Sequence, residues 1–268
     1  MLGLVQGLTE FLPVSSSGHL VVGAHLLGFS QPSLLFDIVL HVGTLLPVLW
    51  LYRADVVDMV GGLRGLLAPA RAWRSQRGFR LLFSVAIGTV PGVVVGVGLD
   101  DLIKRLFSSP VVVGATFLVT GGILMASRLC PAPPAGEEPE DSFLGLTPTR
   151  SLLVGLAQGL AITPGISRSG TTITAALLLG VERTMAARFS FLLSIPAILG
   201  AVALHLADAR LVDLPALLAY AAGALVAAAS GYLALRWLVT LVRRGAMHRF
   251  AYYLWPLGVA VLLYTLLG

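Results

Sequence analysis

Apolar residues occur along this chain in six long runs that are separated by short polar segments. The runs are Leu34–Leu51, Leu81–Leu99, Val111–Ser127, Met185–Leu206, Leu214–Val239 and Phe250–Leu267. Each is close to the roughly 20 predominantly apolar residues that a helix needs to cross a bilayer. The pattern therefore predicts an all-α polytopic membrane protein with six transmembrane helices.

The composition supports this interpretation. Hydrophobic residues make up 57% of the 268 residues and charged residues only 12%, which is about half the charged share of a soluble domain. The net charge of +5 then indicates basic cytoplasmic loops rather than nucleic-acid binding. A single cysteine excludes an internal disulfide and a cysteine-cluster metal site. The first residues lack a basic segment and a cleavage pattern, so we expect no removable signal peptide.

The basic residues also predict an orientation in the membrane. The segment Gly61–Arg80 contains five arginines and no acidic residue. Because arginine-rich loops stay in the cytoplasm, we expect this segment to be a cytoplasmic loop. A second polar segment, residues 130–148, is rich in proline and acidic residues and is typical of a solvated linker.

Two segments of the chain are copies of each other. Gln6-Gly7-Leu8 recurs as Gln158-Gly159-Leu160, a shift of 152 residues. The same shift aligns nine further residues with identical ones: Gly3, Leu4, Ser15, Ser17, Gly18, Ala24, Leu26, Leu27 and Gly28. Three predicted spans separate the copies, and an odd number of crossings makes them enter from opposite faces. We therefore expect a single membrane domain of two inverted repeats, 1–129 and 149–268, joined by the linker.

Each copy has two apolar arms of about ten residues around a polar break. The breaks are Leu12–His19 and Pro164–Thr172. Because an arm of this length is too short to span a bilayer, each copy is expected to be a re-entrant helical hairpin. Irregular backbone at membrane depth must be buried in protein or line a wet cavity, so both breaks should meet near the middle. A helix N-terminus follows each break and offers an anion site.

The break of the second copy carries a basic residue, and the first copy carries an acidic residue. Arg168 lies in an apolar repeat, where a charge needs a counter-charge or an anionic ligand. Glu10 is the obvious counter-charge, and its aligned residue in the second copy is Ile162. A purely structural ion pair is the alternative. Arg168 can donate two hydrogen bonds to phosphate oxygens, while Glu10 can bind a divalent cation or take a proton, and His19 can relay one.

Hydroxyl groups and two further patterns complete the set of candidates. The hydroxyls around the breaks predict a phosphate-binding cradle made by Ser15, Ser16, Ser17, Ser167, Ser169, Thr171 and Thr172.

Asp37 and His41 share a helix face, and we interpret them as a polar pair at the outer end of a span rather than as metal ligands. Gly88, Gly92 and Gly96 have the spacing of close helix packing, which we assign to internal contacts, with a homodimer interface as the alternative.

The segments Gln6–His19 and Pro164–Thr172 closely resemble the two signature segments of the undecaprenyl-pyrophosphate phosphatases, the bacitracin-resistance family. The resemblance implies hydrolysis of undecaprenyl pyrophosphate to undecaprenyl phosphate and inorganic phosphate, which recycles the lipid carrier of cell-wall synthesis. It also implies Mg²⁺ or Ca²⁺ as the activator and an active site that faces outward from the bacterial plasma membrane. The competing class is a transporter, a flippase of a phosphorylated polyprenyl lipid, because inverted repeats with broken helices are typical of secondary transport.

The resemblance also implies roles for individual residues. By matching motif positions, Glu10 resembles the essential acid, Arg168 the phosphate-binding arginine, and His19 a supporting acid or base. Ser16 resembles the proposed nucleophile or phosphate ligand, which leaves open a water nucleophile with Ser16 as a ligand. Many members carry a glutamate where this chain has Gln6, whose amide oxygen can still join Glu10 in coordinating the metal.

Overall fold

The fold is that of a computed structural model, which describes residues 1–27, 34–107, 109–130, 145–205 and 214–267. Every regular element in these residues is a helix. The first half contains α1 (Leu2–Phe11), α2 (Ser16–Leu27), α3 (Leu34–Leu51), α4 (Arg53–Gly62), η1 (Leu63–Leu67), α5 (Pro69–Ser75), α6 (Arg77–Gly98), α7 (Asp100–Phe107), α8 (Pro110–Ala126) and η2 (Ser127–Leu129). The second half contains α9 (Pro148–Leu160), α10 (Arg168–Leu178), α11 (Arg183–His205), α12 (Leu214–Arg243), η4 (Met247–Phe250) and α13 (Ala251–Leu267).

The long helices confirm a multi-pass membrane protein, with five or six candidate spans among the residues that the structure describes. Five helical segments are long and apolar enough to cross a bilayer: Arg77–Gly98, Pro110–Leu129, Arg183–Ala203, Ala216–Arg243 and Met247–Leu267. They coincide with the last five predicted spans. The first predicted span corresponds to α3, whose residues Ile38–Leu51 qualify only together with Arg53–Leu67 of α4 and η1, across a bend of 82°. The predicted span ending at Leu206 extends one residue beyond the described part of α11.

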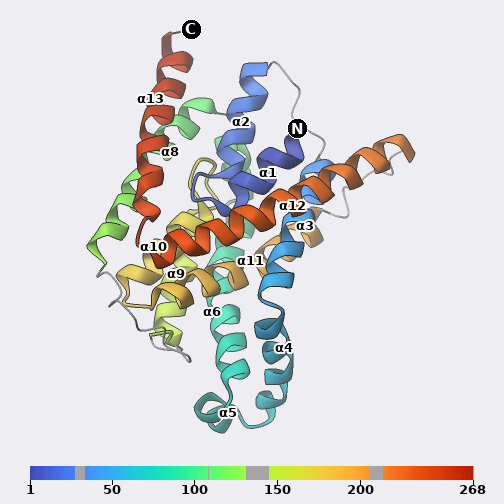
Figure 1. The fold of residues 1–268 in the computed structure, drawn as a ribbon, viewed down its shortest axis with the longest axis vertical. Coiled ribbons are helices and arrows are strands. Elements are labelled where there is room, and N and C mark those ends of the chain that lie inside the picture. Colours follow the sequence, from blue (N-terminus) through green and yellow to red (C-terminus); the bar gives the residue numbers. More distant parts are fainter. Residues whose placement is uncertain (28–33, 108, 131–144, 206–213, 268) are drawn as a thin grey trace.

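The prediction that Gly61–Arg80 is a loop is wrong. Most of this segment is helical, because η1, α5 and the start of α6 fall within it. Together with α4 these elements form a hairpin that projects from the rest of the protein (Figure 1). Asp55 of α4 accepts a hydrogen bond from Arg77 at 2.7 Å, within the hairpin, and one from Arg188 of α11 at 3.5 Å, which ties the hairpin to the rest of the protein. The predicted linker is described only at Cys130 and residues 145–148.

The first helix of each copy is held by close helix packing. Helix α1 packs on α12, and α9 packs on α6. At the first contact, a Cβ on Gly3 would overlap the carbonyl of Gly223, and at the second, a Cβ on Gly155 would overlap that of Gly88. These two approaches occur at aligned residues of the two copies. The glycine spacing of α6 therefore serves packing inside the chain, as predicted.

Candidate active site

The two polar breaks meet in the interior. We call residues 12–15, between α1 and α2, the first tip, and residues 161–167, between α9 and α10, the second tip. A Cβ on Gly18 would lie 2.9 Å from the Cα of Gly165, and a Cβ on Gly170 would lie 3.0 Å from the Cβ of Pro13. The 152-residue shift aligns Gly18 with Gly170 and Pro13 with Gly165, so the two contacts are equivalent in the two copies. Each tip is therefore in direct contact with the first turn of the helix that follows the other tip, so the two breaks meet, as the sequence predicts.

Glu10 is the centre of the polar cluster at the tips. Its side chain is only 6% exposed. One carboxylate oxygen, Oε1, accepts a hydrogen bond from the Arg168 guanidinium at 2.5 Å. The other oxygen, Oε2, accepts hydrogen bonds from Ser16 Oγ at 2.7 Å and Gln6 Nε2 at 3.0 Å. The predicted contact between the acid and the base is thus present, and a hydroxyl donates to the same carboxylate.

Local structure explains why these side chains converge. Gln6 and Glu10 are four residues apart on α1, so they lie on one face of that helix. Ser16 is the first residue of α2 and Arg168 the first residue of α10. They occupy aligned positions in the two copies, and each reaches a different oxygen of Glu10. The repeat therefore supplies two equivalent helix starts, one with a hydroxyl and one with a guanidinium.

Serines cap the helices that leave the tips. The backbone N–H of Gly18 donates to Ser15 Oγ at 3.3 Å, and that of Gly170 donates to Ser167 Oγ at 3.1 Å. Such caps satisfy backbone donors that a helix N-terminus leaves unpaired. Ser169 Oγ donates to the carbonyl of Phe11 at 2.9 Å, which ties the second copy to the C-terminus of α1. Ser15, Ser167 and Ser169 thus have contacts that position the tips.

The remaining hydroxyls differ in their surroundings. Ser17 Oγ lies 3.3 Å from Ser15 Oγ at the first tip. Thr172 is fully buried, donates to the carbonyl of Arg168 at 2.8 Å and contacts Ser190 Oγ of α11 at 2.6 Å. Thr171 Oγ1 is buried without a hydrogen-bond partner among the described residues. Phosphate binding by these hydroxyls stays a prediction.

His19 is engaged away from the carboxylate. Its Nδ1 lies 2.7 Å from the carbonyl oxygen of Ser15, and its Nε2 lies 2.8 Å from the hydroxyl of Tyr253 in α13. Both ring nitrogens therefore have protein partners. The role of His19 as an acid or base stays a prediction, and Tyr253 was not singled out from the sequence because it lies within an apolar run.

A histidine that the sequence did not assign to the site also belongs to the cluster. His41 of α3 places Nε2 3.8 Å from Glu10 Oε2, with 38% of its side chain exposed. This contact with Glu10 was not predicted, because the sequence indicated only a polar residue at the outer end of a span. The side chain of Asp37, its predicted companion, lies outside the described residues. The position of a histidine inside a predicted span was the one signal for this contact. Hydrophobic periodicity does not show which neighbouring helix that side of the span contacts.

Two threonines of α8 hold the second tip and were likewise missed. Thr116 Oγ1 donates to the carbonyl of Pro164 at 2.6 Å, and Thr120 Oγ1 donates to that of Gly165 at 2.8 Å. The backbone N–H of Ser167 in turn donates to Thr120 Oγ1 at 3.3 Å. A neighbouring span thus satisfies backbone groups that an irregular segment at membrane depth cannot leave unpaired.

The donor atoms around Glu10 suit a hard divalent cation that takes its other ligands from a substrate. Glu10 offers a carboxylate, and Gln6 is fully buried with an amide oxygen that has no hydrogen-bond partner in the described part of the chain. Within that part, no three His, Cys, Asp or Glu side chains are grouped to hold a metal by themselves. Mg²⁺ is commonly bound by one or two carboxylates plus substrate phosphates, and these residues fit that arrangement.

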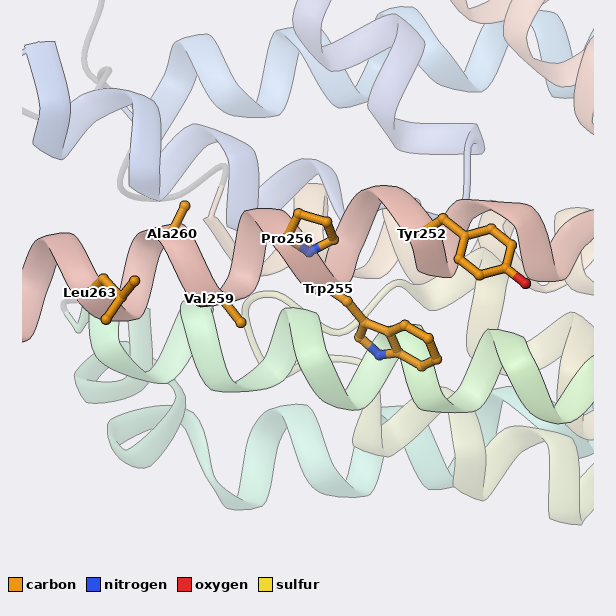
Figure 2. A pocket seen from close by; sticks show the side chains of 6 residues that line it. All are labelled: Tyr252, Trp255, Pro256, Val259, Ala260 and Leu263. Atoms are coloured by element: carbon orange, nitrogen blue, oxygen red, sulfur yellow. The ribbon is translucent and has the colours of Figure 1, made fainter.

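An apolar groove lies along the outer face of α13, apart from this cluster. Figure 2 shows the six side chains that line it: Tyr252, Trp255, Pro256, Val259, Ala260 and Leu263. None of them is a candidate site residue. A helix that crosses a bilayer is expected to present such an apolar face to lipid, so we assign the groove no chemistry.

Gly18→Ala is expected to lower the free energy of unfolding by about 1–3 kcal/mol, the usual cost of overpacking. The new methyl group would lie 2.6 Å from a ring carbon of Phe117 and 2.9 Å from the backbone of Gly165. Gly23→Ala, on the same helix, is the matched control, because its methyl group would have no heavy atom of the described residues within 4 Å. Equilibrium unfolding in detergent measures both variants. Equal stability of the two would contradict the close contact of the tips.

Comparison with known proteins places the chain among phosphatases. The family described as "Bacitracin resistance protein BacA" matches residues 1–260. A protein named undecaprenyl-diphosphatase from Desulfatibacillum aliphaticivorans is 45% identical, over 98% of this chain and 96% of the relative. Relatives of the same name from Methanobrevibacter smithii and Desulfosudis oleivorans are 42% and 45% identical, over 97% and 96% of this chain and 94% of each relative.

Proposed function

Because this chain belongs to the bacitracin resistance protein BacA family, we propose that it hydrolyses undecaprenyl pyrophosphate to undecaprenyl phosphate and inorganic phosphate. Its relatives carry the name undecaprenyl-diphosphatase and match almost the entire chain. The observation that carries the proposal is the pairing of Ser16 Oγ and the Arg168 guanidinium on the two oxygens of one buried carboxylate, Glu10. That arrangement combines a proton acceptor, a hydroxyl and a phosphate-binding cation.

Arg168 binds the terminal phosphate in this proposal. A guanidinium has five N–H donors, and among the described residues the structure gives its side chain one hydrogen-bond acceptor, Glu10. Its side chain is 22% exposed, which leaves donors for phosphate oxygens. The N-termini of α2 and α10 add backbone N–H groups and the positive ends of two helix dipoles. Ser17 and Thr171 are the hydroxyls best placed to supplement them, while Ser15, Ser167, Ser169 and Thr172 chiefly hold the tips.

Ser16 is the nucleophile that the geometry favours. Its Oγ attacks the terminal phosphorus and its proton passes to Glu10, which accepts its hydrogen bond at 2.7 Å. The bond between that phosphorus and the bridging oxygen breaks, and undecaprenyl phosphate leaves with the electron pair. Water then attacks the phosphoserine, Glu10 returns the proton to Ser16 Oγ, and both water protons leave with inorganic phosphate. Direct attack by water, with Ser16 as a ligand, is the alternative, which forms no phosphoserine.

Glu10 and Gln6 would hold Mg²⁺ or Ca²⁺ together with the diphosphate. A bound divalent cation would supply charge neutralisation at the phosphate oxygens. The unpartnered amide oxygen of Gln6 supports this assignment. His41 Nε2, at 3.8 Å from Glu10 Oε2, lies at the open side of the same cluster and would contact the bound head group.

The proposed substrate agrees with the membrane setting. A diphosphate at buried tips requires that its apolar tail leave sideways into the bilayer. The exchanged contacts of Gly18 with Gly165 and of Gly170 with Pro13 support a two-fold relation between the repeats 1–129 and 149–268, as an inverted-topology repeat with two re-entrant hairpins and six spans requires. We place the protein in the bacterial plasma membrane with this site facing outward. A homodimer stays a prediction.

Phosphate release from undecaprenyl pyrophosphate by the purified chain in detergent tests the proposed function. Detergent solution has no compartments, so release of phosphate there reports catalysis and cannot report transport. We expect release that depends on Mg²⁺ or Ca²⁺ and stops with a chelator. A folded protein that binds the lipid but releases no phosphate would favour the flippase instead.

Gln6→Glu is expected to make phosphate release depend more strongly on divalent cations. The amide nitrogen of Gln6 donates to Glu10 at 3.0 Å, and a second carboxylate there would repel Glu10 unless a cation lies between them. The half-activating Mg²⁺ concentration measures the effect. Gln158→Glu is the control, because Ile162 replaces the acid one turn later in the second copy. An unchanged Mg²⁺ titration for Gln6→Glu would remove Gln6 from the metal site.

A further inference from the structure

We propose that Tyr253 is a positioning residue, which acts through His19 to hold Ser16 in place for the reaction; this inference rests on the proposed function. Tyr253 belongs to α13, at the other end of the chain from the first tip. Its hydroxyl lies 2.8 Å from His19 Nε2, and the two rings are stacked with an angle of 8° between their planes. His19 connects in turn to the Ser15 carbonyl.

The acceptors fix the direction of both hydrogen bonds. A carbonyl oxygen only accepts, so His19 Nδ1 must carry the proton that is donated to Ser15. In the neutral ring Nε2 then has the lone pair and must accept, which makes the Tyr253 hydroxyl the donor. The chain of donors runs from Tyr253 through His19 to Ser15. It places His19 in the Nδ1–H tautomer.

The residue at the end of this chain has an unfavourable backbone conformation. Ser15 has a φ of 67° and is the one non-glycine residue with positive φ in the described part of the protein. Residues other than glycine rarely adopt this region, so the surrounding structure must hold it. Ser16 follows directly and donates to Glu10 at 2.7 Å. Relaxation of Ser15 would therefore rotate the Ser16 hydroxyl away from the carboxylate.

The second copy holds its tip in a different way, without hydrogen bonds that correspond to those from Tyr253 through His19 to Ser15. The residue aligned with His19 is Thr171, whose side chain is too short to bridge to a neighbouring span. At the second tip the positive φ belongs to a glycine, Gly165, with a φ of 85°. There the carbonyls of Pro164 and Gly165 are held instead by threonines of α8. Each tip is thus held by a helix of the other repeat: α8 holds the second, and α13 holds the first.

The two helices that hold the tips, α8 and α13, pack side by side. Helices α8 and α13 are in contact along their length (Figure 1), and Phe117 of α8 packs against the His19 ring, with 5.2 Å between ring centroids. His19 is thereby enclosed between Phe117 and Tyr253. The two neighbouring rings pack against His19, and the hydrogen bond from the Tyr253 hydroxyl fixes the rotation of the His19 ring.

The tautomer of His19 is measured by the ¹⁵N spectrum of the full chain labelled at its five histidines, with His19 assigned by its loss in His19→Asn. We expect a protonated Nδ1 and an unprotonated Nε2 for His19, and a shift of the Nε2 resonance in Tyr253→Phe. A proton on Nε2, or an Nε2 resonance that ignores Tyr253→Phe, would overturn the proposal. This readout does not depend on catalysis, so it stands apart from a failure of the proposed function.

Kinetics test the consequence for the reaction. Tyr253→Phe is expected to lower kcat about fivefold, the effect of one hydrogen bond, with KM within about twofold because the head-group ligands are untouched. His19→Asn, whose amide can still donate to Ser15, is expected to keep more activity than His19→Ala. Tyr252→Phe, on the adjacent exposed tyrosine, is the matched control and should leave kcat unchanged. An unchanged kcat in Tyr253→Phe would contradict the positioning role.

Discussion

Glu10→Gln is expected to reduce the rate of phosphate release by a factor of about 10³ or more. The substitution keeps the size of the side chain but removes the proton acceptor of Ser16, and general-base catalysis alone contributes about 10²–10⁴-fold. It also removes the charge that faces Arg168 at 2.5 Å. Initial rates of phosphate release at saturating lipid measure the loss.

Folding must be shown for this variant, because an arginine at membrane depth loses its counter-charge. Size-exclusion chromatography and thermal unfolding in detergent provide that control. Glu182→Gln is the matched substitution, since Glu182 caps the start of α11 by accepting from the backbone of Thr184 and Met185. We expect it to keep near-normal turnover. A folded Glu10→Gln variant with more than a tenth of the wild-type rate would rule out Glu10 as the base.

Arg168→Lys is expected to lower kcat/KM by about 10²-fold, in the range found when one transition-state donor is removed. An ammonium keeps the positive charge and can still pair with Glu10. It cannot, however, reproduce the planar fork that donates two parallel hydrogen bonds to phosphate oxygens. The variant therefore separates a role in phosphate binding from a role as a mere counter-ion.

Arg150→Lys is the control for this substitution, because Arg150 donates to the carbonyl of Gly145 and takes no part in the tips. The same kinetic assay measures both variants over a range of lipid concentrations. Turnover close to wild type in Arg168→Lys would mean that Arg168 serves the fold and that another group binds the phosphate.

Much of the fold follows from hydrophobic periodicity and from one internal repeat. Long apolar runs identify the spans because only a helix satisfies its own backbone in lipid. The shift of 152 residues identified the two breaks, and the contacts of Gly18 with Gly165 and of Glu10 with Arg168 confirm that they meet. The arginine-rich segment was predicted less well, because charge marks a polar surface without excluding helices such as α5.

The candidate site was predicted only as far as the repeats themselves reach. Glu10, Ser16 and Arg168 belong to the copies, so their convergence follows from the hairpins. His41 and Tyr253 come from α3 and α13. An apolar run shows that such a helix crosses the membrane, but not which of its faces meets the tips. The rotation of a helix about its own axis is set by side-chain packing against helices that are far apart in the sequence. No periodic pattern in a single sequence shows this packing.

The most direct measurement is an experimental structure of the full chain with a polyprenyl diphosphate analogue whose bridging oxygen is replaced by a methylene group. We expect the terminal phosphorus to lie between Ser16 Oγ and the Arg168 guanidinium, with Oγ within about 3.5 Å of it, the distance of a near-attack arrangement. A head group bound away from Glu10, or tips separated so that Arg168 cannot reach the same phosphate as Ser16, would contradict it.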